Sequence, residues 1–182
     1  MKISVVTSLY YSEKYIEEFY QRTLKSLLLL TDNFEFIFVD DGSPDNSFYK
    51  AHKICERDSR VKLIKLSKNF GHHKALITGL EQATGDLIWL IDIDLEEDPE
   101  WIIDFYNVFK KNNASVVYGV QKKRKGNILE KYSGKLFFFL LGYFSEASYQ
   151  KNPTIARLMS KQYKDALCLY KEYYPVLLGL WQ

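Results

Sequence analysis

The sequence predicts an α/β fold in which a mostly parallel central sheet is covered by helices on both faces. From residue 3 to residue 120, apolar β-branched segments alternate with segments whose apolar residues recur at helical spacing. This alternating order is typical of parallel sheets with helical crossovers. The segment DLIWLIDID at 86–94 hardly alternates between apolar and polar residues, as expected of a strand buried on both faces.

The individual elements follow in order along the chain. Strands are expected at 3–10, 34–40, 61–67, 86–94 and 115–120, and helices at 12–30, 44–58, 72–83 and 99–112. Ser12 is a candidate N-cap for the first helix, and Pro44 suits the first turn of the second. Pro99 and Glu100 open the fourth helix. Together these elements form a core that ends near residue 120.

The chain changes character after this core. A basic loop, QKKRKGN, occupies 121–127, and mixed polar and apolar residues follow it. Residues 152–174 are expected to form a loop and then a helix. We interpret 121–182 as an extension of the same domain, because 182 residues suit one domain with a sizeable core.

Composition excludes several classes of protein. A net charge of +2 gives no general reason to expect nucleic-acid binding. Cys55 and Cys168 lack metal-binding spacing, which favours reduced thiols in a cytosolic protein. The longest apolar run, 136–144, is too short to span a membrane, so a soluble or surface-bound chain is expected. The apolar segment 175–182 is expected to lead into a segment missing from this sequence or to form a membrane-facing tail. Neither GxGxxG nor GxxxxGK[ST] occurs, which argues against dinucleotide-binding and P-loop proteins.

Polar and charged residues gather where the predicted strands end. Ligands of open α/β sheets bind at the carboxyl ends of the strands, so these residues are expected to converge on one cleft. They are Thr7, Ser8 and Tyr10 after the first strand, Asp40 and Asp41 after the second, Ser67 to Gly71 after the third, and Asp92, Asp94 and Glu96 after the fourth.

The acidic segment after the fourth strand is a candidate metal site. In an extended segment Asp92 and Asp94 point to the same side, and Glu96 continues the series. Carboxylate oxygens suit Mg²⁺ or Mn²⁺, which bridge to substrate phosphates. The alternative is a solvated acidic loop ahead of a helix whose dipole favours acids.

Three segments, in this order and at this spacing, resemble a known family. They are VDDGSPDNS (39–47), LSKNFGHHKALITGLEQATGD (66–86) and IDIDLEEDPEWI (91–102). Together they are similar to the family 2 glycosyltransferases, which have the GT-A fold. The resemblance covers roughly residues 1–165 and is greatest to the type that loads sugars onto polyprenyl phosphates, such as dolichyl-phosphate mannosyltransferases and bactoprenol glucosyltransferases.

The resemblance implies roles for residues of the donor site. Asp92 and Asp94 would act in catalysis by holding Mg²⁺ or Mn²⁺ and the donor diphosphate, with Glu96 as an additional ligand. The residues expected to contact the nucleotide sugar are Ser8, Tyr10, Asp40, Asp41, Lys68 and Asp92. Among these, Asp41 would hold the base or ribose and Asp40 would support it. Lys68 stands where the family usually has arginine, so it meets a diphosphate as a point charge.

The region after residue 120 is expected to serve the acceptor. It lacks the Glu-Asp pair that usually supplies the base in hydroxyl-transferring relatives, which favours a phosphate acceptor. Lys123, Arg124 and Arg157 are expected to bind that phosphate. The segment KLFFFLLGYF (135–144) is interpreted as a membrane-interface helix, with an ordinary buried helix as the alternative. His72 and His73 are interpreted as structural or solvent-facing residues.

The resemblance therefore implies a metal-dependent, inverting enzyme. Residues 1–120 would bind a UDP- or GDP-linked sugar, and 121–182 would face the acceptor and the membrane. The acceptor would be a polyprenyl phosphate, and the protein would be cytoplasmic and peripheral on the inner face of the membrane. One alternative is transfer to a sugar hydroxyl in surface polysaccharide synthesis. Departures at Tyr11, Lys68, Gln121 and Ala156 motivate another, a catalytically weak nucleotide-binding subunit of a membrane complex. For both enzyme functions, the protein is expected to work with a membrane partner subunit or as a homo-oligomer.

Overall fold

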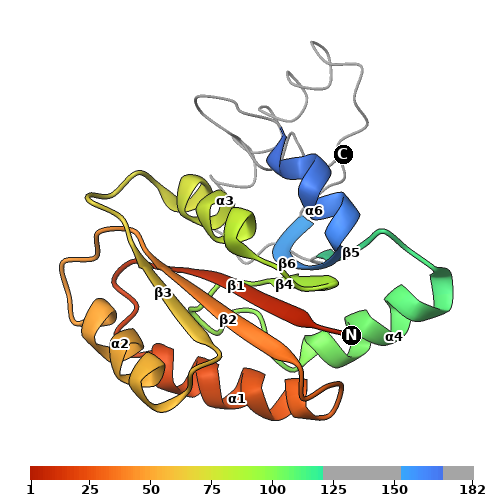
Figure 1. Ribbon diagram of the computed structural model, residues 1–182, viewed down its shortest axis with the longest axis horizontal. Coiled ribbons are helices and arrows are strands. Elements are labelled where there is room, and N and C mark those ends of the chain that lie inside the picture. The colour runs from red at the N-terminus through yellow and green to blue at the C-terminus, as the bar shows by residue number, and fades with distance from the viewer. Residues whose placement is uncertain (121–152, 170–182) are drawn as a thin grey trace, which may run out of the picture.

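The computed structural model describes residues 1–120 and 153–169, which form a three-layer α/β arrangement (Figure 1). One six-stranded sheet has the strand order β3-β2-β1-β4-β6-β5. The strands are β1 (Ile3–Leu9), β2 (Phe34–Asp40), β3 (Val61–Lys65), β4 (Leu87–Leu90), β5 (Val116–Val120) and β6 (Pro153–Ser160). The predicted α/β fold with a mostly parallel sheet is confirmed.

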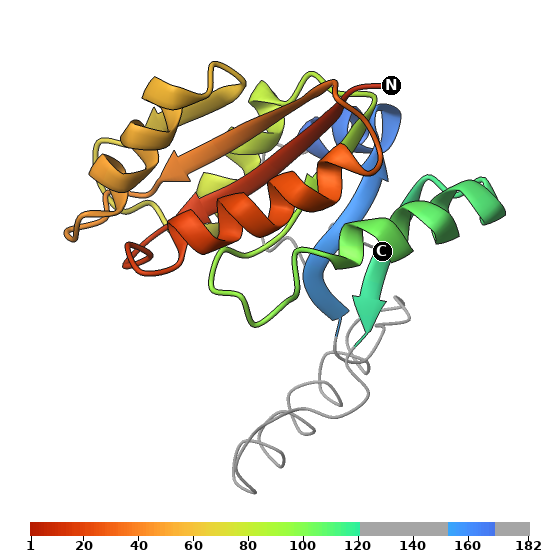
Figure 2. The same cartoon turned by 90° about the horizontal axis from the view of Figure 1, so that it is seen from below.

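Four neighbouring strands are parallel, and one strand runs against them. β1 pairs in parallel with both β2 and β4, and β2 pairs in parallel with β3. β6 is antiparallel to β4 on one side and to β5 on the other. In Figure 2 the blue arrow of β6 accordingly points opposite to the arrows of β1, β2 and β5. The carboxyl ends of the four parallel strands therefore share one edge of the sheet.

Helices cover both faces of the sheet, as predicted. α1 (Ile16–Leu28), α2 (Ser47–Arg57) and α4 (Trp101–Asn112) pack on one face, and α3 (His72–Gln82) and α6 (Lys161–Cys168) pack on the other (Figure 1). Each face has its own apolar core. Phe19 and Phe36 belong to the first core, and Leu76 and Ile88 belong to the second. Alternate residues of a strand point to opposite faces, so both cores draw on the same strands.

Three predicted helix starts are too early. α4 begins at Trp101 and not at Pro99, and the other two are those of α1 and α2. α1 begins at Ile16, because the Oγ of Ser12 accepts the backbone N–H of Tyr10 and stabilises a turn before the helix. α2 begins at Ser47, so Pro44 lies in the preceding loop. In both cases the loop after a strand is longer than the helical pattern suggested. These longer loops border the carboxyl edge of the sheet.

The predicted loop after residue 152 is a strand as far as Ser160. Ala156 and Leu158 of β6 face one core, and Met159 faces the other. The strand was missed because Arg157 interrupts its apolar pattern, yet this arginine is buried. Arg157 satisfies part of its hydrogen-bonding capacity locally, since its Nε donates to the carbonyl of Ile155 at 3.1 Å. A charged residue at that position made the segment look like a loop.

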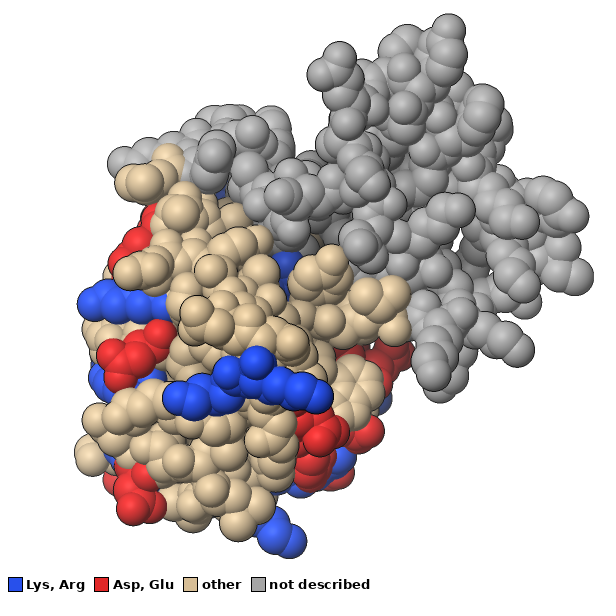
Figure 3. Space-filling view, turned by 90° about the vertical axis from the view of Figure 1, so that its right-hand side faces the viewer, with Lys and Arg blue, Asp and Glu red and all other residues tan. Residues whose placement is uncertain are grey.

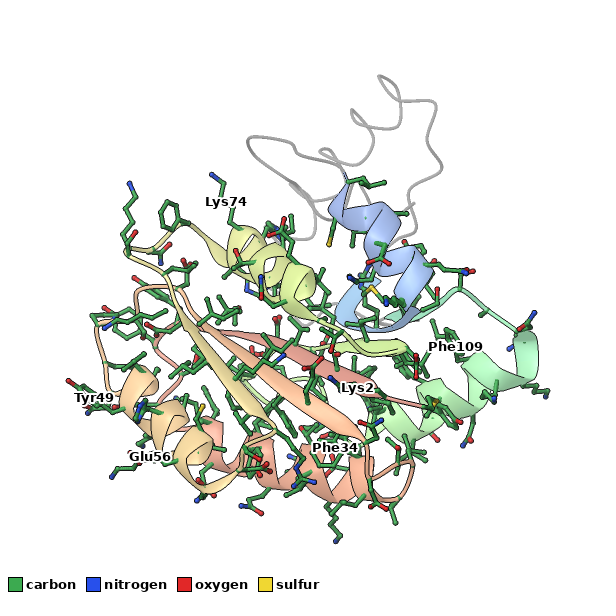
Figure 4. The ribbon with its side chains drawn as sticks, in the orientation of Figure 1. Lys2, Phe34, Tyr49, Glu56, Lys74 and Phe109 are labelled. Carbon is green, nitrogen blue, oxygen red and sulfur yellow. The ribbon has the colours of Figure 1, made fainter. Side chains whose placement is uncertain are left out.

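The amino edge of the sheet is fastened by the buried carboxylate of Glu35. Its oxygens accept hydrogen bonds from Ser4 Oγ (2.7 Å), Thr84 Oγ1 (2.7 Å) and Lys62 Nζ (2.8 Å). Lys2 Nζ completes the group at 3.1 Å. Lys2 and the neighbouring Phe34 are labelled in Figure 4, at the starts of β1 and β2. This network anchors the edge opposite to the candidate site.

Charged side chains of both signs are interspersed over a mostly uncharged surface on the face seen in Figure 3. Among the described residues, no helix combines the length and the apolar content that crossing a bilayer requires.

Candidate active site

The loops after β1, β2, β3 and β4 meet at the carboxyl edge of the sheet. Leu9 is paired with Asp40, and Asp40 is paired with Lys65, so these strands end level with one another. The backbone N–H of Asp41 continues the ladder by donating to the carbonyl of Leu9 at 3.0 Å. The predicted convergence of Ser8, Asp40 and Asp41 on one edge follows from this register.

Asp41 holds the loop between β3 and α3. Its Oδ1 accepts the backbone N–H of Phe70 at 2.7 Å, and its Oδ2 accepts that of Gly71 at 3.0 Å. Gly42 lies directly under the same loop, where an added Cβ would come within 2.7 Å of the carbonyl carbon of Lys68. The buried Asp41 carboxylate thus positions a backbone segment, a role that the sequence did not reveal. Its direct contact with a base or ribose stays a prediction.

Asp40 ends β2 as a fully buried carboxylate. Neither of its oxygens makes a hydrogen bond of good geometry among the described residues. Burial raises the pKa of Asp40, and the backbone N–H of Ser43 and the charge of Lys65 oppose that rise. The carboxylate is therefore only partly compensated and can accept a further hydrogen bond.

The β1–α1 loop presents two tyrosines. The rings of Tyr10 and Tyr11 lie edge to face, with centroids 4.8 Å apart. Tyr11 has a left-handed backbone (φ 52°), and the residue is 60% exposed. Its N–H donates to Ser43 Oγ at 2.8 Å, which in turn donates to Asp45 Oδ1 at 2.6 Å. The loop is therefore held by the β2–α2 loop and leaves both aromatic rings at the mouth of the site.

Lys68 lies on the β3–α3 loop that Asp41 holds. The side chain is exposed, and its Nζ lies 5.2 Å from the ring centroid of Phe70. Its position at the carboxyl edge suits the predicted interaction with a diphosphate.

The acidic loop after β4 holds the predicted metal ligands. β4 ends at Leu90, so Asp92 and Asp94 lie in the following turn and not in an extended strand. Burial raises the pKa of Asp92 to about 7, and the charges of Asp94 and Glu96 contribute to the rise. Asp94 is exposed, and its Oδ1 accepts the backbone N–H of Glu96 at 3.0 Å. The three carboxyl groups are thus close enough to repel one another.

These carboxylates fit a divalent cation that is shared with a substrate. In residues 1–120 and 153–169, no three His, Cys, Asp or Glu side chains converge as a metal site. The predicted set of Asp92, Asp94 and Glu96 is therefore not assembled as a three-ligand site in this part of the chain. Mg²⁺ often binds through only one or two carboxylates together with substrate phosphates. The charges of Asp94 and Glu96 oppose ionisation of Asp92, and a cation bound at this loop would relieve that repulsion.

His72, interpreted from the sequence as structural or solvent-facing, lies within this site. Its Nδ1 is 2.9 Å from Ser8 Oγ, and its Nε2 is 3.3 Å from Asp92 Oδ1. Desolvation lowers the pKa of His72, and the charges of Asp41 and Asp94 oppose that effect. The sequence could have indicated this place for His72, because the residue begins the predicted helix 72–83 at the same edge of the sheet as Asp92.

Glu97 is a second residue that the sequence did not single out. Its Oε1 accepts the N–H of Ile155 at 3.0 Å, and its Oε2 accepts that of Ala156 at 2.8 Å. Burial raises the pKa of Glu97 to about 6, against the hydrogen bond from Ala156, and the charge of Asp92 adds to the rise. Glu97 therefore joins the acidic loop to β6.

Two of the three predicted acceptor residues, Lys123 and Arg124, lie outside the described residues. Arg157 lies on β6 and is buried, and its Nη2 donates to the carbonyl of Thr154 at 2.9 Å. Burial lowers the pKa of Arg157 to about 9. Its predicted contact with a phosphate stays a prediction.

A mostly parallel sheet with carboxylates, a lysine and exposed aromatic rings at its carboxyl edge places the chain among the α/β proteins that bind ligands at that edge. Comparison with known proteins gives the family. The model of "Glycosyl transferase family 2" matches residues 4–163, and the chain belongs to this family.

Two curated relatives illustrate the range of similarity. A protein of Mycobacterium tuberculosis (strain CDC 1551 / Oshkosh) described as "Putative glycosyltransferases" is 41% identical over 182 residues, which is 100% of this chain and 53% of the relative. An undecaprenyl-phosphate 4-deoxy-4-formamido-L-arabinose transferase of Yersinia pestis (strain Pestoides F) is 30% identical over 173 residues, 94% of this chain and 48% of the relative. The chain thus spans about half the length of these relatives.

Solved structures agree on the fold. The mannosyltransferase PcManGT from Pyrobaculum calidifontis, in complex with GDP-Man and Mn²⁺, gives a TM-score of 0.64 at 18% identity and covers 91% of this chain and 46% of the other. S. aureus TarS 1-349, in complex with UDP-GlcNAc, gives 0.54 at 28% identity and covers 70% and 36%. The GT-A glycosyltransferase fold is confirmed.

Proposed function

We propose that this chain is the catalytic region of a Mg²⁺- or Mn²⁺-dependent, inverting glycosyltransferase. It would move a sugar from a UDP- or GDP-linked donor to a polyprenyl phosphate at the cytosolic face of a membrane. The observation that carries the proposal is the position of Asp92 and Asp94 directly after β4, at the carboxyl edge of the sheet where open α/β sheets bind their ligands. Family membership supports sugar transfer, and the undecaprenyl-phosphate transferase among its relatives supports the acceptor.

The donor half of the reaction follows from the geometry of the carboxyl edge. The rings of Tyr10 and Tyr11 would pack against the base, next to the buried Asp40. Lys68 would neutralise part of the diphosphate from the loop that Asp41 holds in place. The nucleotide would then lie across the ends of β1, β2 and β3.

Asp92 and Asp94 would hold the cation together with the donor phosphates. The cation, when bound, neutralises the negative charge that grows on the leaving diphosphate. The chain's own contribution would be to hold the carboxylates of Asp92 and Asp94 at the carboxyl edge and to supply the positive charge of Lys68 for the diphosphate. Stabilisation of developing charge by groups already in position is the largest catalytic effect in many enzymes.

A phosphate acceptor would need no general base from Glu97. A sugar hydroxyl must lose a proton to a general base as it attacks. The buried Glu97 has both carboxylate oxygens engaged by backbone N–H groups, so it is a poor candidate for that base. A polyprenyl phosphate is already anionic near neutral pH and needs no base. This comparison favours the lipid phosphate over a hydroxyl of a growing polysaccharide.

Calorimetric titration of UDP, GDP and dTDP tests the donor site. Each nucleotide is titrated in Mn²⁺ and in EDTA, into the wild-type chain and into Asp94→Asn. We expect one nucleotide to bind in Mn²⁺ and to bind at least roughly tenfold more weakly in EDTA or in the variant. Absence of nucleotide binding under every condition would refute the donor site. Binding that EDTA leaves unchanged would refute the metal role alone.

Radiolabelled sugar transfer then tests the acceptor and the membrane location. The donor that binds is offered with undecaprenyl phosphate in vesicles, and separately with free sugar acceptors. Product in the lipid phase supports the proposed reaction. Product only on the sugar acceptor supports transfer in polysaccharide synthesis, and nucleotide binding without either product supports a weak subunit of a membrane complex.

A further inference from the structure

His72 links three elements of the site through one imidazole ring. The ring stands at the start of α3, with Ser8 at the end of β1 on one side and Asp92 after β4 on the other. The distances are 2.9 Å from Nδ1 to Ser8 Oγ and 3.3 Å from Nε2 to Asp92 Oδ1. Both ring nitrogens therefore have a partner, one of them a proposed metal-binding carboxylate.

With Asp92 ionised, as a metal-binding carboxylate must be, the chemistry of the partners sets the direction of these contacts. A neutral imidazole has one N–H donor and one bare nitrogen acceptor. An ionised carboxylate only accepts, so the Nε2 that faces Asp92 Oδ1 carries the hydrogen. Nδ1 is then the acceptor, and the Ser8 hydroxyl donates to it. The result is a series of contacts from Ser8 through His72 to Asp92, in which each group orients the next.

This series of contacts restrains the Asp92 carboxylate, which would otherwise be poorly placed. Asp92 is repelled by both Asp94 and Glu96, and its side chain is 29% exposed. Within the described part of the chain, His72 is the side chain that lies within ion-pair distance of the Asp92 carboxylate. The 3.3 Å contact between Nε2 and Oδ1 therefore restrains one oxygen and leaves Oδ2 available to the site. Partners of this kind, one step removed from a metal, orient ligating groups in metal sites generally.

We propose that His72 is a positioning residue that orients Asp92 for the divalent cation of the donor complex, and that Ser8 orients His72. The inference rests on the proposed function, because it deepens the role of the same site. His72 touches neither cation nor sugar, and it acts through Asp92.

His73 provides a matched control on the same helical turn. The two rings are 5.5 Å apart between centroids. His73 Nδ1 is buried and has no hydrogen-bond partner among the described residues, whereas both ring nitrogens of His72 are engaged. A general effect of removing an imidazole from the start of α3 would appear in both variants, and a positioning effect would appear only at His72.

The test measures Mn²⁺ affinity by electron paramagnetic resonance at saturating nucleotide, using whichever of UDP or GDP binds. The variants are His72→Ala, His72→Gln, His73→Ala, Ser8→Ala and the double variant Ser8→Ala/His72→Ala. Thermal denaturation of each variant checks that it is folded. Free Mn²⁺ is the probe, so the readout does not depend on turnover.

We expect His72→Ala to weaken Mn²⁺ binding roughly 10- to 100-fold. His72→Gln should recover most of the affinity, because its amide N–H can reach Asp92 from the same backbone position. His73→Ala should leave Mn²⁺ affinity unchanged. Ser8→Ala alone should weaken it several-fold but should add nothing to His72→Ala, since coupled residues in one chain are not additive.

Several results would overturn the inference. Wild-type Mn²⁺ affinity in His72→Ala would remove the positioning role and leave the proposed function intact. Tighter binding in that variant would mean that His72 competes with the cation. Equal losses in His72→Ala, His72→Gln and His73→Ala would indicate a structural effect of the helix start. If the wild-type chain binds neither Mn²⁺ nor nucleotide, the proposed function fails and the inference fails with it.

Discussion

Replacing Asp92 with asparagine should stabilise the metal-free protein at alkaline pH. The Asp92 carboxyl has an ordinary pKa of 3.8, which burial and the charges of Asp94 and Glu96 raise to about 7 in the folded chain. Between these two pH values the folded state binds a proton that the unfolded state has lost. Stability is therefore complete below pH 3.8, falls as pH rises, and reaches its lower level above about pH 7.

The size of the effect follows from the two pKa values. The difference between 3.8 and about 7 corresponds to roughly 4 kcal/mol at about 1.36 kcal/mol per pKa unit. Because the side chain is 29% exposed, solvent screening reduces this to about 2–3 kcal/mol. An asparagine side chain has the same shape as aspartate and carries no charge. For a chain of this size we expect Asp92→Asn to melt roughly 5–10 °C higher than the wild type at pH 8.

Thermal denaturation from pH 4 to pH 8.5, in EDTA, measures this difference. The two melting temperatures should coincide near pH 4 and separate progressively up to pH 8. Glu97 and His72 titrate in both proteins, so their contributions largely cancel in the difference. Added Mn²⁺ with nucleotide should raise the wild-type melting temperature and should have little effect on the variant. A difference that does not change with pH, or a variant less stable at pH 8, would refute the account of Asp92.

Three further substitutions probe the surrounding structure. Gly42→Ala should lower the free energy of unfolding in urea by roughly 2–3 kcal/mol and weaken nucleotide binding, because the φ of Gly42 is +64° and the new Cβ would meet the backbone of Lys68 at 2.7 Å. Unchanged nucleotide binding would contradict this placement of the loop. Tyr11→Asn should raise the melting temperature by about 2–4 °C, since asparagine tolerates a φ of 52°, and a lower melting temperature would argue against strain at this residue. The same variant should bind nucleotide roughly tenfold more weakly in calorimetry, because it lacks the aromatic ring. Glu35→Gln should lower the free energy of unfolding by about 2 kcal/mol at pH 7, and this loss should shrink as the pH falls below 4.5. The reason is that, despite burial, hydrogen bonds from Lys62 and Ser4 hold the pKa of Glu35 well below its usual range. A loss of stability that persists in acid would show that charge is not involved.

Periodicity along the chain predicted the architecture correctly where each segment has a single pattern. The parallel strands and the helices between them are confirmed, and with them the convergence of Asp41 and Asp92 on one edge. β6 was missed because burial of Arg157 depends on neighbouring strands that no local pattern reveals. The same limit applies to contacts across the site. That His72 lies between Ser8 and Asp92 depends on how α3 packs against the ends of β1 and β4.

Individual roles were harder to predict than positions. The side-by-side aspartates at the end of β2 were expected to serve the nucleotide together, yet they differ in the structure. Asp41 accepts two backbone N–H groups from the β3–α3 loop, and Asp40 makes no hydrogen bond of good geometry among the described residues. Sequence gives both carboxylates the same chemistry, and only the path of the next loop distinguishes them.

The pairing of β5 with β6 has a consequence for how such enzymes diversify. Val120 and Pro153 are partners across this antiparallel ladder, although many residues separate them in the sequence. The entropy of closing a chain between two fixed neighbours changes only slowly with the number of residues between them. Relatives can therefore differ in length between these two positions while the described sheet keeps its order. A change of sequence there would leave the carboxyl edge of β1, β2, β3 and β4 unaltered.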